Sequence, residues 1–311
     1  MSKKRSRNLL TAKVSDTQIS MISIINGVPD SVMIEPFDPK RDDISQTLSK
    51  LSSGTGVRLK ELRICIPQKN VFYIDSIEVD PMTEEALLTN LPYEFHEYVG
   101  DVRIFDYEYD YSVKKENRTY TGAIESYEIS AIAIEKRFLH DITNGAKKAH
   151  LRLTQVVPEA ECFVNLIKDA RENGRSKESV FCFAEVGTSS TNIIICSENG
   201  LIFSREIEMG IPTEYKPGHG MGFYGTDLRA ELALEIERTV RKCETDNNSL
   251  NIQGIYLLGE GCLNKGFIDN VCDRMTDKKV RYISDLFDET VNDELCCRYA
   301  VLFCLGLAEE V

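Results

Sequence analysis

The sequence predicts a two-lobed α/β protein, and three observations lead to that prediction. A chain of 311 residues exceeds what one simple core usually holds and suits two lobes of ordinary domain size. β-prone apolar runs alternate with segments of helical periodicity. Both halves also follow one plan, in which a β-meander with a polar turn after its first strand precedes helix, strand and helix. We expect lobes at 1–175 and 176–311, joined by the linker Asn173–Ser176.

Composition and charge argue against several classes of protein. The chain is 42% hydrophobic and 28% charged, as in soluble globular proteins. A net charge of −13 argues against nucleic acid as a partner, because that binding needs a basic surface. The longest apolar run, Ala300–Ala308, is too short to span a membrane, and the basic amino terminus lacks the apolar region of a signal peptide. We expect a cytoplasmic protein that does not itself insert into the membrane.

The ten cysteines and four histidines form no metal-binding motif. Cysteines such as Cys65, Cys182, Cys196 and Cys304 lie inside apolar runs, and no C-x-x-C occurs. That setting is typical of buried, reduced thiols. The histidines are scattered along the chain, so we predict no metal site.

The first half opens with a predicted meander that leads into a helix and a fourth strand. The polar turn Ser15-Asp16-Thr17 follows its first strand, and Asp42 or Asp43 can cap the helix. The predicted strands are Leu9–Val14, Ile19–Asn26, Ser31–Phe37 and Glu61–Ile66, and the helix is Asp42–Leu51. Later elements of this lobe are a strand at Tyr127–Ile134, a helix at Glu135–Lys148, a strand at Arg152–Val157 and a helix at Glu159–Asn173.

A section with a different sequence pattern interrupts this half, from about Val71 to Arg118. Val71–Val79 alternates as a strand does, and Pro81–Val99 has the start signals and spacing of a helix. Val102–Tyr111 alternates with a shift of face midway, which predicts a half-buried strand with a bulge, before a charged turn at Lys114–Thr119. We interpret residues 71–118 as a small inserted α+β module.

The second half opens with the hairpin Phe181–Ile207. Two apolar runs flank the small-residue loop Gly187–Ser190, and Asn199-Gly200 marks a tight turn before a third strand. Such a loop presents backbone N–H groups and hydroxyls in a compact space that can hold a phosphate. An ordinary meander with a Ser/Thr-rich turn is the alternative interpretation.

The rest of the second half is predicted to form helices that alternate with short strands. The final helix is apolar on most faces, so we expect it to pack back on the N-terminal lobe. The predicted elements are the Gly-rich loop Pro217–Gly225, the helix Asp227–Cys243, the strand Gln253–Leu258, the turn Gly259-Glu260-Gly261, the helix Lys265–Met275, the strand Val280–Ile283 and the helix Glu294–Leu307.

Four stretches resemble the PilM family of type IV pilus assembly proteins, which is itself similar to the cell-division protein FtsA. They are Ile77–Val99, Val102–Tyr109, Ala184–Gly210, and Ile255–Gly266 with the final helix. The resemblance covers nearly the whole chain in order. It implies the actin-like fold shared with Hsp70 and sugar kinases, in which the first turn of each lobe grips the phosphates of a nucleotide and a late glycine turn supports the nucleoside.

The resemblance also implies where ATP with Mg²⁺ would bind, if binding is retained. Those positions are Ser15, Asp16, Thr17, Glu185, Gly187, Thr188, Ser189, Gly259, Glu260 and Gly261. The first loop departs from the family's pattern of acid, glycine and lysine, because Lys13, Ser15 and Ser20 stand there. The second loop keeps glycine and threonine but has Glu185 in place of Asp, and only a short loop follows Gly210. We therefore expect nucleotide binding to be weak or absent.

The family's partner is the cytoplasmic tail of a membrane-anchored PilN-like protein, and the resemblance implies that the inserted module holds it in a groove. The residues expected in that groove are Tyr93, Phe95, Phe105 and Tyr107. A module whose aromatic side chains simply form a small core is the alternative.

Three functions therefore compete. The first is a scaffold of a type IV pilus or type II secretion-like machine, peripheral to the inner face of the membrane through its partner and open to self-association. The second is an ATP-binding assembly switch or FtsA-like division protein. A small-molecule kinase is the third; it needs phosphate clamps and a positioned base, which a first loop without glycine does not supply. We rank the scaffold first and leave enzymatic activity uncertain, with at most slow ATP hydrolysis.

Overall fold

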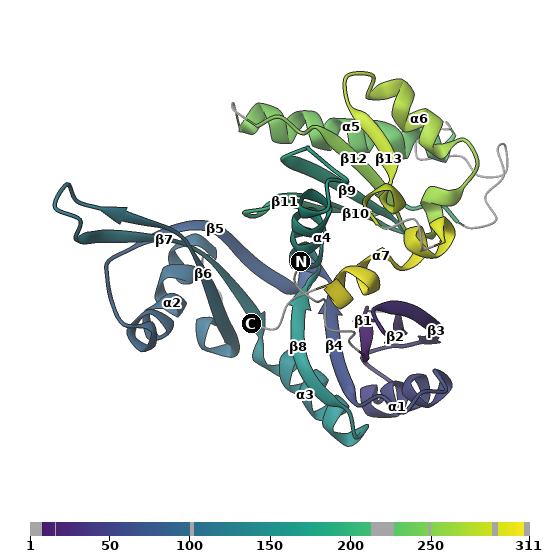
Figure 1. The fold of residues 1–311 in the computed structure, drawn as a ribbon, viewed down its shortest axis with the longest axis horizontal. Coiled ribbons are helices and arrows are strands. Elements are labelled where there is room, and N and C mark those ends of the chain that lie inside the picture. Colours follow the sequence, from purple (N-terminus) through teal and green to yellow (C-terminus); the bar gives the residue numbers. More distant parts are fainter. Residues whose placement is uncertain are drawn as a thin grey trace. The chain divides into compact units, whose positions relative to one another are not determined.

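The computed structural model describes residues 8–15, 17–99, 103–212, 227–247, 250–287 and 292–307. The chain divides into two compact units, Met1–Glu159 and Ala160–Val311 (Figure 1). Each unit contains a five-stranded sheet in which an antiparallel meander leads into parallel strands. This is the repeated plan that the sequence predicts. The division falls at the first turn of helix α4, ahead of the predicted linker.

The sheet of the first unit has the strand order β3-β2-β1-β4-β8. One face of β1 places Leu10, Ala12 and Val14 in the core, because side chains alternate along a strand. Helices α1 and α3 pack on each other beside this core, and Gly145 of α3 permits their approach, since a Cβ there would lie 2.4 Å from Cγ2 of Ile44. The elements are β1 (Leu9–Val14), β2 (Gln18–Ile25), β3 (Val28–Pro36), α1 (Ile44–Gly54), β4 (Glu61–Ile66), α3 (Lys136–Lys148) and β8 (Arg152–Pro158).

The inserted module has its own three-stranded sheet, in the order β5-β7-β6, with α2 packed against it (Figure 1). Three expectations were wrong. Ile104–Asp106 forms a 3-10 turn instead of a strand, and β6 continues through the predicted charged turn to Arg118 because it stays paired with β7. The module also extends to Glu135, since β7 is its central strand. Its elements are η1 (Gln68–Asn70), β5 (Val71–Val79), α2 (Glu84–Val99), η2 (Ile104–Asp106), β6 (Tyr107–Arg118) and β7 (Ile124–Glu135).

The sheet of the second unit has the order β11-β10-β9-β12-β13. Its core is aromatic: Phe163 of α4 stacks on Phe183 of β9 at a centroid distance of 4.3 Å, and Phe181 and Tyr256 extend the stack. The elements are α4 (Glu159–Glu172), β9 (Val180–Val186), β10 (Thr191–Ser197), β11 (Gly200–Ile207), α5 (Leu228–Asp246), β12 (Gly254–Leu258), η3 (Glu260–Leu263), α6 (Phe267–Arg274), β13 (Lys279–Tyr282), η4 (Ile283–Leu286) and α7 (Asp293–Leu307).

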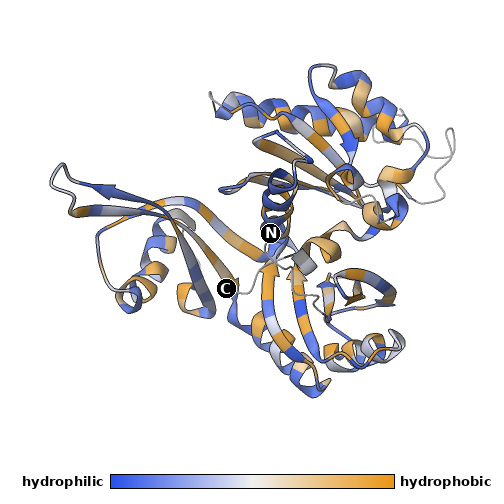
Figure 2. Ribbon diagram, in the orientation of Figure 1, coloured by the Kyte–Doolittle hydropathy of each residue, from blue (hydrophilic) through white to orange (hydrophobic). Residues whose placement is uncertain are grey.

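Helix α7 packs against η3, η4 and β12 within its own unit. It is predominantly apolar, like the central strands of both sheets (Figure 2). The expectation that α7 also packs on the other lobe stays a prediction. The predicted Gly-rich loop 217–225 lies outside the described residues. Within the described part of the chain, no helix combines the length and apolarity that crossing a membrane requires.

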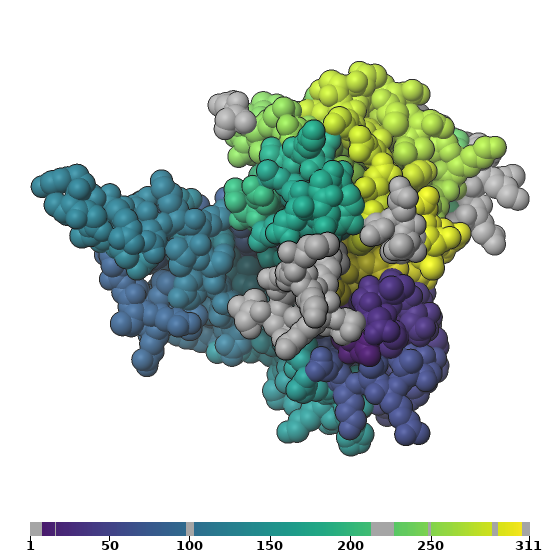
Figure 3. Space-filling view, in the orientation of Figure 1, coloured from purple at the N-terminus to yellow at the C-terminus, as the bar shows by residue number. Residues whose placement is uncertain are grey.

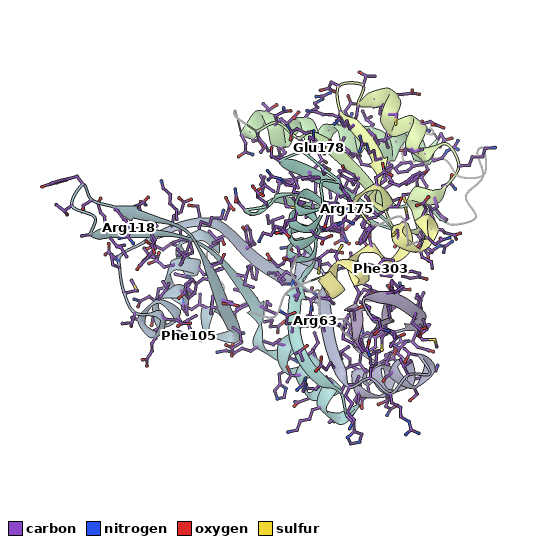
Figure 4. All side chains as sticks on the ribbon, viewed as in Figure 1. Arg63, Phe105, Arg118, Arg175, Glu178 and Phe303 are labelled. Carbon is purple, nitrogen blue, oxygen red and sulfur yellow. The ribbon has the colours of Figure 1, made fainter. Side chains whose placement is uncertain are left out.

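The predicted linker is held in place by ion pairs rather than left loose. Arg175 pairs with Asp169 of α4, and Lys279 of β13 donates to Glu178 at 2.8 Å; Arg175 and Glu178 are labelled in Figure 4. Burial alone would raise the pKa of Glu178. Hydrogen bonds from Lys279, Ser176 and the backbone, with the charge of Lys279, lower that pKa to about 2 instead.

Candidate functional site

In the turn between β1 and β2, the donors of the described residues Ser15, Thr17 and Gln18 form hydrogen bonds within the turn itself. The N–H and hydroxyl of Ser15 both donate to the carbonyl of Gln18, at 3.0 and 2.9 Å. The N–H groups of Thr17 and Gln18 donate in turn to the hydroxyl oxygen of Ser15, at 3.4 and 3.2 Å. A phosphate loop works by converging such N–H groups on the anion, whereas the N–H groups of Ser15, Thr17 and Gln18 donate within the turn. Asp16 lies outside the described residues.

A cation occupies the end of β1 just before this turn. Lys13 forms an ion pair with Glu159, with Nζ 2.6 Å from Oε1, and the glutamate side chain is fully buried. The resemblance puts an acid at the position of Lys13. Mg²⁺ is held by carboxylates and water, so a lysine there does not provide a metal ligand. Among the described residues, no group of three or more His, Cys, Asp or Glu side chains could hold a metal ion.

The turn between β9 and β10 is packed directly against another backbone segment. The N–H of Gly187 donates to the carbonyl of Ser190 at 2.9 Å, and the N–H of Ile211 donates to the carbonyl of Gly187 at 2.9 Å. A Cβ on Gly210 would lie 2.4 Å from the oxygen of Gly187 and 2.5 Å from the nitrogen of Ser189. Thr188 and Ser189 are exposed. The close packing alone therefore explains why Gly210 lacks a side chain.

The glycine turn after β12 lies beside the same place, because β12 pairs in parallel with β9 and sets Leu258 opposite Glu185. Gly259 has φ +86°, and a Cβ there would meet the carbonyl oxygen of Val186 at 2.4 Å. A Cβ on Gly261 would lie 2.9 Å from the oxygen of Gly187. The structure thus brings the second and third predicted turns together and explains both glycines by backbone packing.

Glu260 of this turn is tied to helix α7. Its carboxylate accepts from Arg298 at 3.3 Å, and the N–H of Gly259 donates to the carbonyl of Cys297 at 2.8 Å. These bonds hold η3 against α7 within the second unit. Glu260 therefore has a structural role that its sequence setting does not reveal.

The inserted module carries a groove between α2 and the η2–β6 segment, with a volume of about 230 Å³. Phe105, which is labelled in Figure 4, is one of its lining residues. Apolar and aromatic side chains dominate the walls, with one carboxylate and one ammonium group. The lining residues are Leu88, Pro92, Ile104, Phe105, Tyr107, Glu108, Tyr109 and Lys136.

Two aromatic side chains beside the groove are exposed. Tyr93 is 57% exposed and Phe105 65%, and their rings meet edge to face with centroids 6.1 Å apart. Lys136 at the start of α3 donates to the carbonyl of Phe105 at 3.0 Å, which fixes η2 to the body of the unit. Tyr107 is half-buried and packs edge to face against Phe72.

Phe95 is a correction to the predicted groove. It is 2% exposed and packs on Tyr109 in the module core, with centroids 5.1 Å apart. Burial, with the charge of Tyr107, raises the pKa of Tyr109, whose hydroxyl donates to the carbonyl of Ile104 at 2.5 Å. Helix α2 turns Phe95 inward and Tyr93 outward, so the core alternative holds for Phe95, and the groove stays a prediction for the other three residues.

Sequence reasoning missed Leu88, Pro92 and Lys136 as groove residues. The first two lie four apart on α2, so they share one face of the helix. They border the buried row Leu87, Leu91 and Phe95, so the helical spacing could have identified them once Phe95 was assigned to the core. Lys136 comes from a different element and gives no local signal.

Comparisons with known proteins identify the fold. No family model matches the sequence, and no curated protein matches it. Among solved structures, the PilM–PilN type IV pilus biogenesis complex matches with a TM-score of 0.71 at 15% identity, over 97% of this chain and 98% of that chain. A Bacteroides thetaiotaomicron protein with an actin-like ATPase fold and unknown function matches with a TM-score of 0.52 at 14% identity, over 98% of each chain. The ethanolamine utilization protein EutJ from Carboxydothermus hydrogenoformans matches with a TM-score of 0.50 at 10% identity, over 97% of this chain and 89% of that one. The predicted fold class is confirmed: this chain has the actin-like ATPase fold and resembles the PilM–PilN structure over nearly its whole length.

Proposed function

We propose that this protein is a scaffold that docks the cytoplasmic tail of a membrane-anchored, PilN-like protein in a type IV pilus or type II secretion-like machine. The exposed aromatic groove of the module carries this proposal. Contiguous exposed apolar side chains mark interaction sites on soluble proteins. The likeness to a solved PilM–PilN complex supports the choice of partner.

The groove suits an extended peptide. Leu88, Pro92 and Phe105 offer an apolar pocket for an anchoring side chain. Strand β6 lies at the edge of its sheet, so main-chain groups on its outer side face away from β7. Peptides that bind in this way combine main-chain bonds to an edge strand with a few apolar anchors. Through such a tail the protein would work in the cytoplasm, at the inner face of the membrane.

An ATP-binding assembly switch is the second candidate. The convergence of the turns 187–190 and 259–261 favours it, because the resemblance puts the phosphate and nucleoside contacts there. The self-bonded Ser15 turn and the Lys13–Glu159 ion pair weigh against it. We therefore infer that nucleotide binding is weak or absent, and that the tail binds without it.

The test uses the tail of a membrane protein encoded beside this chain. Calorimetric titration should show binding to the wild type and a loss of about tenfold or more in Phe105→Ala, because exposed aromatic anchors dominate such interfaces. Tyr120→Ala is the matched control, since Tyr120 is fully exposed at the far end of the β6–β7 hairpin, which stands clear of the rest of the module (Figure 3). A folded Phe105→Ala variant that binds as tightly as the control would overturn the proposal.

A further inference from the structure

We infer that the groove selects a basic tail, in which one large apolar side chain is flanked by lysine or arginine. This inference rests on the proposed function and names the chemistry of its partner. It follows from the size of the groove, the charge of its rim and the hydrogen-bonding groups in its wall.

The size of the groove limits the apolar part of the ligand. A volume of about 230 Å³ is below the range of roughly 300–1,000 Å³ that drug-sized ligands occupy. It therefore holds one large side chain rather than the apolar face of a whole helix. The remaining contacts of a bound peptide must come from the rim.

The rim is acidic. Glu84 and Glu85 are exposed in the first turn of α2, and Asp106, Glu108 and Asp110 are exposed along η2 and β6. Helix α2 as a whole carries four glutamates and no lysine or arginine. Burial raises the pKa of Tyr111 on β6, and the negative charges of Glu84 and Asp110 raise it further. Glu84 of α2 and Asp110 of β6 thus both act on this side chain.

Two cations near the groove are already engaged. Lys136 donates to the carbonyl of Phe105 at 3.0 Å and lies 4.0 Å from Glu108. Arg103 lies 4.0 Å from Asp106. The five exposed carboxylates of α2, η2 and β6 against these two cations leave a net charge of −3 among the residues named here. A positively charged ligand neutralises this excess of negative charge, whereas an acidic ligand is repelled by it.

The groove wall also carries a backbone acceptor. Pro92 lies inside α2 and has no N–H to donate to the carbonyl of Leu88, four residues earlier. Both residues line the groove. The usual helical bond to this carbonyl is therefore missing at the wall, which offers an acceptor to a donor-rich ligand.

A basic ligand also fits the topology of the partner. Cytoplasmic segments next to membrane helices carry an excess of lysine and arginine. A tail that begins close to the membrane is therefore positively charged, which complements the negative charge around this groove. The chain as a whole, with a net charge of −13, is itself acidic.

The experiment is a selection of random linear peptides displayed on phage against the full-length protein, followed by fluorescence anisotropy with synthetic copies. We expect the peptides that require Phe105 to carry lysine or arginine on both sides of one large apolar residue. Their affinity should fall by about tenfold from low to high salt, since exposed charges are screened. A Glu84→Lys/Glu108→Lys variant should reject them, while the charge-matched Glu172→Lys/Asp273→Lys variant should bind normally.

The outcomes separate this inference from the proposed function. Peptides that require Phe105 but are neutral or acidic, and bind independently of salt, would overturn the inference and leave a docking groove in place. Selection of no Phe105-dependent peptide would count against the groove as a docking site and against the inference with it. Equal binding to the two charge-reversed variants would also overturn the inference.

Discussion

The module groove and the glycine turns of the second unit were both predicted as sites, and they differ in what their special residues contact. In the groove, Tyr93 and Phe105 are exposed beside an apolar pocket. In the turns, Gly210, Gly259 and Gly261 are pressed against the backbone of residues 186–189. Apolar surface left open indicates a missing partner, whereas glycines already in contact with backbone are explained by the fold alone.

The same contrast appears between the two first turns. Ser15 accepts from the N–H groups of Thr17 and Gln18 in its own turn, while Gly187 and Ser190 form part of a wider packed cluster. Neither arrangement requires a ligand to be stable. The predictions below test whether the turns serve folding and the groove serves binding.

The largest effect is expected from Gly259→Ala. Its Cβ would lie 2.4 Å from the oxygen of Val186, in backbone at φ +86°. Such a clash should lower the free energy of unfolding by more than about 4 kcal/mol. Gly27→Ala is the matched control, because Gly27 has φ +79° with open space around its Cβ, and its cost should be about 1 kcal/mol. Denaturant titration measures both, and equal losses would show that the turn is not tightly packed.

The next effect is a pH dependence from Glu178. Its pKa in the folded protein is about 2, below the ordinary 4.5, so its contribution to stability is present above pH 4.5 and is lost as the pH falls toward 2. Glu178→Gln should therefore lower the free energy of unfolding at pH 7 by up to about 3 kcal/mol. The difference from wild type should vanish near pH 2. A difference that persists unchanged at low pH would contradict the ion-pair explanation.

A smaller effect is expected from Ser15→Ala. Loss of the hydroxyl removes the acceptor for the N–H groups of Thr17 and Gln18, which should cost about 1 kcal/mol. The two N–H groups would then be available to an anion. If Ser15 excludes phosphate, this variant should bind nucleotide no more weakly than the wild type; weaker binding would show that Ser15 contacts the nucleotide.

The smallest expected effect is on thermal stability with Mg-ATP. A ligand at about 100 times its dissociation constant stabilises by roughly 2.7 kcal/mol, which shifts the melting temperature by several degrees. We expect no resolvable shift at millimolar Mg-ATP. A shift of several degrees that disappears in Thr188→Arg would establish a nucleotide site in the second unit.

Local signals predicted most of the fold. Glu61–Ile66 and Val71–Val79 were predicted with their observed bounds, and Asp43 caps α1 as expected by accepting from the N–H of Ser45. The alternating pattern that begins at Val102 led to a strand prediction where a 3-10 turn forms. A 3-10 turn and a strand can share the same spacing of apolar residues over a few positions. The bond partners of Lys13 and Glu178 lie 146 and 101 residues away, so only the folded chain reveals them.

The site was less predictable than the fold for the same reason. An aromatic residue on α2 faces the core or the solvent according to its helical phase, which separates Phe95 from Tyr93. Glycines that permit backbone packing and glycines that bind phosphate look alike in a sequence. Only the atoms that surround Gly210 and Gly259 distinguish the two roles.

The most direct test measures the affinity of the partner tail by calorimetric titration with and without millimolar Mg-ATP. If the groove binds the tail and the turns serve only folding, the dissociation constant should be the same in both conditions and should rise by about tenfold or more in Phe105→Ala. Because coupling between two binding sites is reciprocal, a nucleotide that changes tail affinity must itself bind and bias the protein. A tenfold change on adding Mg-ATP, with Phe105→Ala unaffected, would contradict the scaffold function and favour a nucleotide-driven switch.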